Sequence, residues 1–144
     1  MKKIKKNDIL NYCFKEKLYL TPTRIILIDL LSKHSKPKSA YELLKLINKK
    51  KNMNLNISTI YRVLNFWVAL GFVHKISALN KYILCGRPDE KHVHMLNFCV
   101  RCEKIIESCN KSVDLNLEKI TKNLNLKLIN SRSLEIPVIC SSCN

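Results

Sequence analysis

The sequence predicts an α+β protein made of two small domains joined by a short hinge. Three observations predict it. First, three consecutive segments with apolar residues at helical spacing precede two short β-prone runs. Second, the excess of Lys and Arg over Asp and Glu drops sharply after residue 75. Third, two Cys-x-x-Cys pairs lie on either side of a second segment with helix and strand patterns. We therefore place one domain at residues 1–85, a hinge at residues 86–95 and a second domain at residues 96–144.

The composition is that of a globular protein, because 47% of the 144 residues are apolar. Polar residues interrupt the first twenty positions too often for a signal peptide, and no run of 18 apolar residues exists to cross a membrane. We expect a cytoplasmic protein, in whose reducing surroundings the seven cysteines are metal ligands or thiols, not disulfides.

Two helices are predicted first. Thr21 and Pro22 supply an N-cap and a proline at the first helical position, and the apolar run that follows continues until Pro37 ends the segment. Ser39 and Glu42 then form a capping-box pattern. The apolar residues of this second helix recur at helical spacing: Ala40, Leu43, Leu44 and Ile47.

A third helix and a hairpin complete the first domain. Ser58 is the expected N-cap, and Gly71 suits the left-handed position at the helix end. One apolar stripe follows the helix through Ile60, Val63, Leu64 and Trp67. The β-prone runs "FVHKI" and "KYILC", separated by residues 77–80, read as a hairpin. This order of elements is that of a winged helix-turn-helix domain.

Double-stranded DNA is the partner that this domain favours. Residues 1–75 carry 16 Lys or Arg against 4 Asp or Glu, whereas residues 76–144 carry 10 against 7. Such a charge suggests a domain that binds polyanions, with membrane headgroups a weaker alternative, although a basic surface can also be merely solvated. The candidate contacts on the third helix are Ser58, Thr59, Tyr61 and Arg62. Arginine reads guanine and a tyrosine ring packs on a thymine methyl, although these side chains could also simply cover the helix surface.

The lysines of the first six residues, Lys2, Lys3, Lys5 and Lys6, admit two interpretations. They could reach phosphate or a minor groove, or they could form a solvated tail, which is the commoner role of a short lysine run.

The two Cys-x-x-Cys pairs predict a structural zinc site in the second domain. The pairs are Cys99 with Cys102 and Cys140 with Cys143. Each spacing allows two thiolates from one tight turn to meet a tetrahedral ion, so together they fill its coordination. Four buried thiols or a redox pair are the alternatives, but no thioredoxin-like βαβ pattern surrounds either pair.

The segment between the pairs predicts one helix and two strands. Val113, Leu117, Ile120 and Leu124 mark an amphipathic helix, and strands are expected at residues 102–107 and 126–136. One helix on so small a sheet leaves an apolar face exposed. The second domain is therefore expected to be a small α/β dimerisation domain, and the protein a homodimer.

A second set of potential ligands lies around the hinge: His74, Cys85, His92 or His94, and Glu107. Each alone is commonly structural. Together, two imidazoles, a thiolate and a carboxylate cancel the charge of a divalent cation and would join the two domains. A soft thiolate favours zinc over ferrous iron or manganese.

From Leu20 to Cys143 the sequence resembles the ferric uptake regulator family, and within it the zinc uptake regulator branch. The motifs that carry the resemblance are "LTPTR", "SAYELLKLI", "STIYRVLNFWVALGFVHKI", "YILC", "CVRCEKIIESC" and "CSSC". The resemblance implies a homodimeric winged-helix repressor of zinc-uptake genes that binds palindromic, AT-rich operators when loaded with zinc. It also implies two zinc ions per chain, one structural and one regulatory.

Matched position by position, the resemblance gives the four cysteines the structural role. It makes His74, Cys85, His92 and Glu107 the sensing ligands, and Tyr41, Tyr61 and Arg62 DNA contacts. His92 is preferred to His94 because it keeps the family's seven-residue distance to Cys99. Two departures are the missing glycine before the last thiol pair and a histidine-poor hinge, which argues against iron sensing.

Three alternatives remain. A constitutive zinc-ribbon protein would bind nucleic acid regardless of a regulatory ion. An iron-sensing member of the family is another alternative, as is a peroxide-sensing member that responds through Cys109 or the thiol pairs. A zinc hydrolase needs an open coordination position, which a site filled by four protein ligands lacks. We therefore expect no enzyme and no small-molecule substrate. Cys13, in a helical core, and Cys109, near the surface, are not expected to bind metal.

Overall fold

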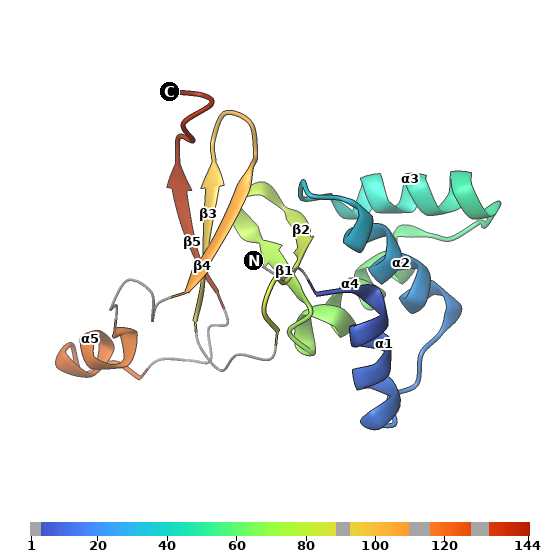
Figure 1. The fold of residues 1–144 in the computed structure, drawn as a ribbon, viewed down its shortest axis with the longest axis horizontal. Coiled ribbons are helices and arrows are strands. Elements are labelled where there is room, and N and C mark those ends of the chain that lie inside the picture. The colour runs from blue at the N-terminus through green and yellow to red at the C-terminus, as the bar shows by residue number, and fades with distance from the viewer. Residues whose placement is uncertain (1–3, 89–92, 110–115, 128–132) are drawn as a thin grey trace. The chain divides into compact units, whose positions relative to one another are not determined.

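The computed structural model describes residues 4–88, 93–109, 116–127 and 133–144. The chain divides into two compact units, residues 1–88 and residues 89–144, called here the N-terminal and the C-terminal unit (Figure 1). No helix among the described residues combines the length and apolar character that crossing a bilayer requires.

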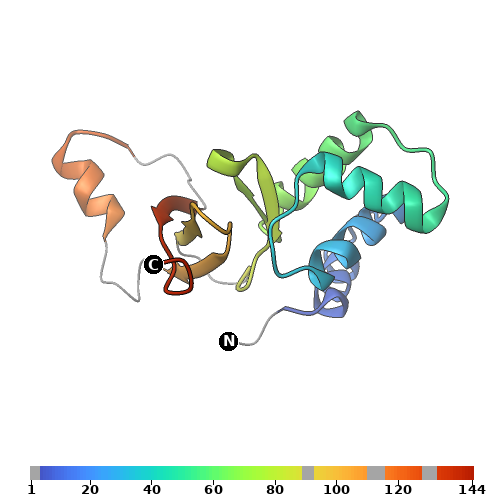
Figure 2. The same cartoon turned by 90° about the horizontal axis from the view of Figure 1, so that it is seen from above.

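The N-terminal unit contains four helices followed by a hairpin. The elements are α1 (Lys6–Lys15), α2 (Pro22–Lys33), α3 (Ala40–Lys51), α4 (Ile57–Ala69), β1 (Val73–Ile76), a 3₁₀ turn (Ser77–Leu79) and β2 (Lys81–Leu84). Both views show the helices grouped on one side of the hairpin (Figure 1, Figure 2). The predicted three helices and hairpin are present, and α1 is an additional helix that the sequence analysis did not separate from the basic N-terminal segment.

The predicted helix starts are confirmed for α2 and α3 and wrong for α4. The Thr21 hydroxyl accepts the Arg24 N–H at 3.3 Å, and Ser39 and Glu42 form the expected capping box. Helix α4 is capped by Asn56, whose side chain accepts the N–H of Thr59 at 2.9 Å, so Ser58 lies inside the first turn. Asparagine is as good a cap as serine and stands two residues earlier.

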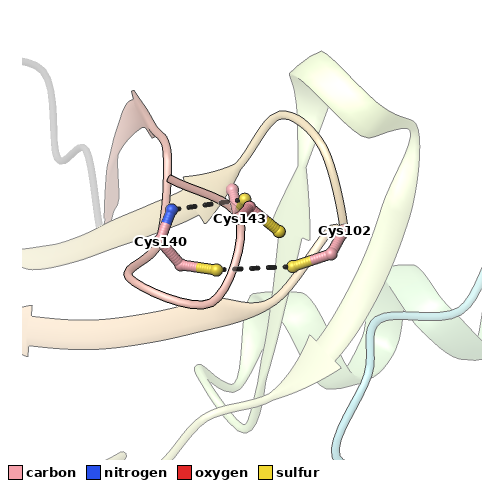
Figure 3. Close-up of side chains that lie close together, drawn as sticks. Cys102, Cys140 and Cys143 are labelled. Carbon is pink, nitrogen blue, oxygen red and sulfur yellow. Dashed lines mark hydrogen bonds between the residues drawn. The ribbon is translucent and has the colours of Figure 1, made fainter.

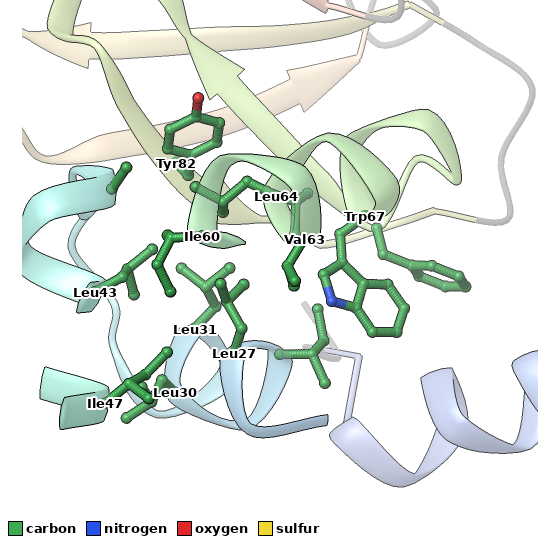
Figure 4. Close-up of a cluster of buried hydrophobic side chains, with 14 of the residues drawn as sticks. Leu27, Leu30, Leu31, Leu43, Ile47, Ile60, Val63, Leu64, Trp67 and Tyr82 are labelled. Carbon is green, nitrogen blue, oxygen red and sulfur yellow. The ribbon is translucent and has the colours of Figure 1, made fainter. Parts of the chain in front are cut away.

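One apolar core holds the helices of this unit together (Figure 4). The predicted α4 stripe is buried and meets side chains of α2 and α3: Leu27, Leu31, Leu43, Ile47, Ile60, Val63, Leu64 and Trp67. Helix α1 adds Ile9 and Cys13 to the same core, both fully buried, which confirms the expected place of Cys13. Gly71 takes φ 81° after α4, as the predicted helix end requires.

The hairpin is tied to the start of α3. Strands β1 and β2 pair antiparallel, with Val73 opposite Leu84. Tyr82 of β2 exchanges two backbone hydrogen bonds with Lys38, at 2.8 and 2.9 Å. Because Lys38 immediately precedes the Ser39 cap, this bridge links the hairpin to the helix-turn-helix.

The described residues of the C-terminal unit form a three-stranded mixed sheet and one short helix. Its elements are β3 (His94–Cys99), β4 (Ile105–Cys109), α5 (Leu117–Asn123) and β5 (Ser133–Val138). Strand β3 is central, antiparallel to β4 and parallel to β5. The parallel pairing sets the carboxyl ends of β3 and β5 at the same edge of the sheet.

The predicted strand boundaries in this unit were wrong. The strand expected at residues 102–107 spans Ile105–Cys109 because Cys102 lies in the preceding turn. The strand expected at residues 126–136 is Ser133–Val138, and Leu126 is outside it. Strand β3 was not predicted and begins at His94, inside the proposed hinge. The predicted helix is present as α5, while Val113 lies outside the described residues.

Candidate metal centres

The four predicted zinc ligands meet at one edge of the C-terminal sheet. Cys99 ends β3 and Cys102 lies in the turn that follows, whereas Cys140 and Cys143 follow β5. Their four sulfur atoms all lie within 4.8 Å of one another. Figure 3 shows the Sγ atoms of Cys102 and Cys140 facing each other, 3.6 Å apart. The parallel β3–β5 pairing therefore brings together two pairs that are distant in the sequence.

Backbone hydrogen bonds shape both cysteine turns. The Cys143 N–H donates to the Cys140 carbonyl at 2.9 Å, and the Glu103 N–H donates to the Cys99 carbonyl at the same distance. The Arg101 guanidinium donates to the Cys143 carbonyl and so links the first turn to the second. The sulfur cluster is thus held by the backbone of two turns.

The electrostatics of the cluster suit a divalent cation. The Cys140 N–H donates to the Cys99 sulfur at 3.4 Å, and this bond, with others from neighbouring amides, lowers the Cys99 pKa to about 6. The nearby sulfurs of Cys102 and Cys140 raise the Cys143 pKa to about 12. Four thiolates this close repel one another unless a cation lies between them. Four sulfur donors in two tight turns are the donor set of a structural zinc site.

Two buried donors lie side by side in the N-terminal unit. His74 is on β1 and Cys85 directly follows β2, and their exposed fractions are 4% and 0%. Their ligand atoms lie within 4.8 Å of each other. The Cys85 N–H donates to the Phe72 carbonyl at 2.8 Å, which continues the hairpin ladder by one residue and holds the backbone of Cys85. We call His74 and Cys85 the hairpin donor pair.

A second pair of donors lies in the C-terminal unit. The Nδ1 atom of His94, on β3, is 2.5 Å from a carboxylate oxygen of Glu107, on β4. His94 lies opposite Cys109, two residues from Glu107, so the two side chains share one face of the sheet. We call His94 and Glu107 the sheet donor pair. The other predicted imidazole, His92, lies outside the described residues.

The predicted DNA contacts occupy the first turn of α3 and the first two turns of α4. Tyr41 is 65% exposed at the second position of α3. On α4, Ser58 and Arg62 are exposed, while Tyr61 is half-buried. The Thr59 hydroxyl donates to the capping Asn56 side chain at 2.9 Å. These positions present polar side chains from the start of each helix of the helix-turn-helix.

Arg24 has an anchoring role that the sequence analysis missed. Its guanidinium stacks on the Phe66 ring, 3.6 Å from the centroid, and donates to the Tyr19 carbonyl at 2.5 Å. Its carbonyl accepts the indole N–H of Trp67 at 3.2 Å. Helix α4 is therefore fixed to the start of α2. The signal was present in the motif "LTPTR", where Arg24 follows the cap of α2 at its third position.

Comparison with known proteins relates these features to one family. The sequence profile of the ferric uptake regulator family matches residues 15–136. The zinc uptake regulation protein of Escherichia coli strain K12 is 30% identical over 132 residues, which cover 91% of this chain and 76% of the relative.

Solved structures of zinc uptake regulators have the same fold as this chain. A zinc uptake regulator complexed with zinc and DNA superposes with a TM-score of 0.82 at 28% identity, covering 98% of this chain and 96% of the other. Holo XcZur superposes with a TM-score of 0.81 at 30% identity, covering 96% and 95%. With a family profile that spans most of the sequence and relatives that match nearly all of it, the chain belongs to the ferric uptake regulator family.

Proposed function

We propose that this protein is a zinc-responsive transcriptional repressor. In this proposal a zinc-loaded homodimer binds palindromic, AT-rich operators and represses genes of zinc uptake. Support comes from the family, from relatives that are named zinc uptake regulators, and from the zinc and DNA in one of the similar structures. The observation that carries the proposal is the presence of two donor sets, four cysteines and the two donor pairs, in one chain.

The four cysteines form the proposed structural site, the first of two zinc ions per chain. The turn after β3 and the turn after β5 supply two thiolates each. Bound zinc would cross-link these turns and leave no position for a catalytic water. Because β5 follows β4 only after a long connection, the cross-link would also hold the third strand of the sheet.

The hairpin donor pair and the sheet donor pair form the proposed regulatory site. Neither pair alone completes a tetrahedral shell, so a four-ligand site needs both. Residues 1–85 would then bind DNA and residues 96–144 would dimerise. The proposed hinge at residues 86–95 overlaps β3, which begins at His94. A thiolate among the ligands favours zinc over ferrous iron.

One imidazole of the regulatory site remains to be assigned between His92 and His94. The contact of His94 with Glu107 supports His94, because a carboxylate that holds one ring nitrogen orients the ring for its ligand role. Replacing each histidine with glutamine separates them. Loss of the regulatory zinc, with the structural zinc retained, identifies the ligand.

Regulation follows from thermodynamic linkage. A site whose donors come from both units binds zinc tightly only in those arrangements where the donors converge. If the operator binds the same arrangements, zinc and DNA must strengthen each other's binding equally. A coupling of about 1–3 kcal/mol per site corresponds to roughly 5- to 150-fold in operator affinity.

DNA recognition is assigned to the starts of α3 and α4. Arg62 is the proposed bidentate donor to guanine, and Tyr61 the ring that packs on a thymine methyl. Ser58 and Thr59 would contact the DNA backbone or the base edges from the first turn of α4. Tyr41 would contact the DNA from α3.

Homodimerisation is supported by apolar side chains exposed in the C-terminal unit. Ile106 and Leu134 are 51% and 37% exposed on the face opposite Glu107, and Ile120 and Leu124 of α5 are 45% and 64% exposed. A second copy of this unit would bury such surface.

The test is operator binding across buffered free zinc at fixed salt, with fluorescent duplexes from upstream of a zinc-importer gene. Parallel titrations use ferrous iron and manganese. We expect affinity to rise steeply with zinc alone. Binding indifferent to zinc would support a constitutive nucleic-acid-binding protein, and binding promoted best by iron would overturn the assigned role of Cys85.

A further inference from the structure

One side of α3 carries exposed positive charge. Tyr41, Lys45 and Lys49 follow one another at four-residue spacing, which places them on one side of the helix. All three are exposed, and we call them the α3 ridge. The opposite side of α3 supplies Leu43 and Ile47 to the core (Figure 4), so the ridge faces away from it.

The charge of the ridge is not neutralised within the N-terminal unit. Residues 1–75 contain four carboxylates, three of which are engaged elsewhere. Asp8 accepts from the backbone at the start of α1, Asp29 pairs with lysines of α1 and α2, and Glu42 binds Lys38 and its own helix cap. Neither lysine of the ridge has an ion-pair partner in the part of the chain that the structure describes.

We propose that the α3 ridge binds the phosphate backbone of DNA. The inference rests on the proposed function, because the ridge continues from Tyr41, the contact assigned to α3. Lys49 lies eight residues beyond Tyr41, about 12 Å along the helix. That length spans roughly three phosphates at 3.4 Å of helix axis each. Contacts of this kind set affinity and orientation, and they do not depend on base sequence.

A second copy of the chain fits the ridge less well than DNA does. Two ridges facing each other would place like charges together, which opposes association. No exposed aliphatic side chain accompanies these lysines on α3 among the described residues. A duplex offers the complementary charge along a line, as the ridge does.

The test compares two double variants of equal charge. Lys45→Gln with Lys49→Gln removes the ridge charges, and glutamine keeps the helix propensity. Lys119→Gln with Lys122→Gln is the control, on two exposed positions of α5. Dissociation constants of the full-length, zinc-loaded protein are measured over a salt series, on operator and on scrambled duplexes.

We expect the ridge variant to bind both duplexes about ten-fold more weakly and its salt slope to fall by about 1 per lysine, with the control near wild type. Equal losses in both variants would overturn the inference, since net charge alone would explain them. If the ridge variant lost affinity only for duplexes that carry two adjacent operators, the inference would be overturned. The ridge would then mediate contacts between protein molecules bound side by side. Zinc-independent DNA binding by the wild type would refute the proposed function. The comparison of salt slopes between the ridge variant and the control would still show whether the ridge binds phosphates.

Discussion

The two units differ in how their apolar side chains are used. In the N-terminal unit most large aliphatic side chains of α2, α3 and α4 are buried in one core or packed against it, and the exposed large apolar residues of its described part are all aromatic. The described part of the C-terminal unit instead exposes seven aliphatic side chains: Val100, Ile106, Ile120, Leu124, Leu126, Leu134 and Ile139. A fold of so few strands cannot bury enough surface by itself. The N-terminal unit is thus stabilised by packing, whereas the proposed zinc site and the proposed dimerisation would supply much of the stability of the C-terminal unit.

The largest expected effect is the loss of the C-terminal fold in Cys99→Ser. Structural zinc contributes about 10–16 kcal/mol of apparent binding free energy in small domains, so breaking its site removes most of the unit's stability. We expect loss of one zinc per chain and of hydrogen-exchange protection in β3 and β5, with the N-terminal unit still folded. Cys109→Ser is the matched control and should keep both ions. A Cys99→Ser protein that retained its zinc and sheet would contradict this view.

Next in size is Leu64→Ala, which removes a fully buried side chain from the N-terminal core. The expected cost is about 3 kcal/mol in the free energy of unfolding, because the cavity refills only in part. Urea unfolding followed by Trp67 fluorescence measures it. Phe14→Ala, at a position that is 85% exposed, should change the same transition little. Equal costs at both positions would show that packing does not dominate in this unit.

Cys85→Ser tests whether zinc couples the units. We expect roughly 5- to 150-fold weaker operator binding at saturating zinc, with the thermal unfolding of both units preserved. The loss arises because a hydroxyl is a much poorer zinc ligand than a thiolate. Operator titration against buffered zinc measures it, and an unaltered zinc dependence in the variant would refute the regulatory role of the hairpin donor pair.

The smallest expected effect concerns Asp29, which joins α2 to Lys6 of α1 at 3.2 Å. The hydrogen bond from the Lys33 ammonium, aided by Lys6, holds the pKa of the Asp29 carboxyl below its usual value. A lowered pKa stabilises the folded unit at neutral pH, and the stabilisation disappears as the pH falls through the carboxyl range. Asp29→Asn should therefore cost about 0.5 kcal/mol at pH 7 and nothing near pH 2. A cost that persisted in acid would show that the contact is not electrostatic.

Features set by neighbouring residues were predictable from the sequence. The caps Thr21 and Ser39 and the apolar stripe of α4 need only local hydrogen bonds and helical spacing. Strand β3 was not predictable in this way, because it is central and nearly all of its residues are buried on both faces. It therefore lacks the polar-apolar alternation that marks a half-buried strand.

The candidate site shows the same limit. Two Cys-x-x-Cys pairs predicted the four-sulfur cluster because both spacings carry the geometry of a tetrahedral ion. The choice between His92 and His94 was beyond sequence reasoning. Residues two apart on an extended chain point to the same side, so alternation cannot separate them. Contacts between strands bear on this choice, and the structure describes one of them, between His94 and Glu107.

The parallel pairing of β3 with β5 has a consequence for synthesis in the cell. When a ribosome has completed β4 at Cys109, one edge of β3 still lacks the strand that begins at Ser133. At a synthesis rate of about 5–20 residues per second, roughly one to five seconds pass before the ribosome reaches β5. An open strand edge is a template for pairing with other chains. Nascent copies on neighbouring ribosomes would therefore be most prone to aggregate before β5 joins the sheet.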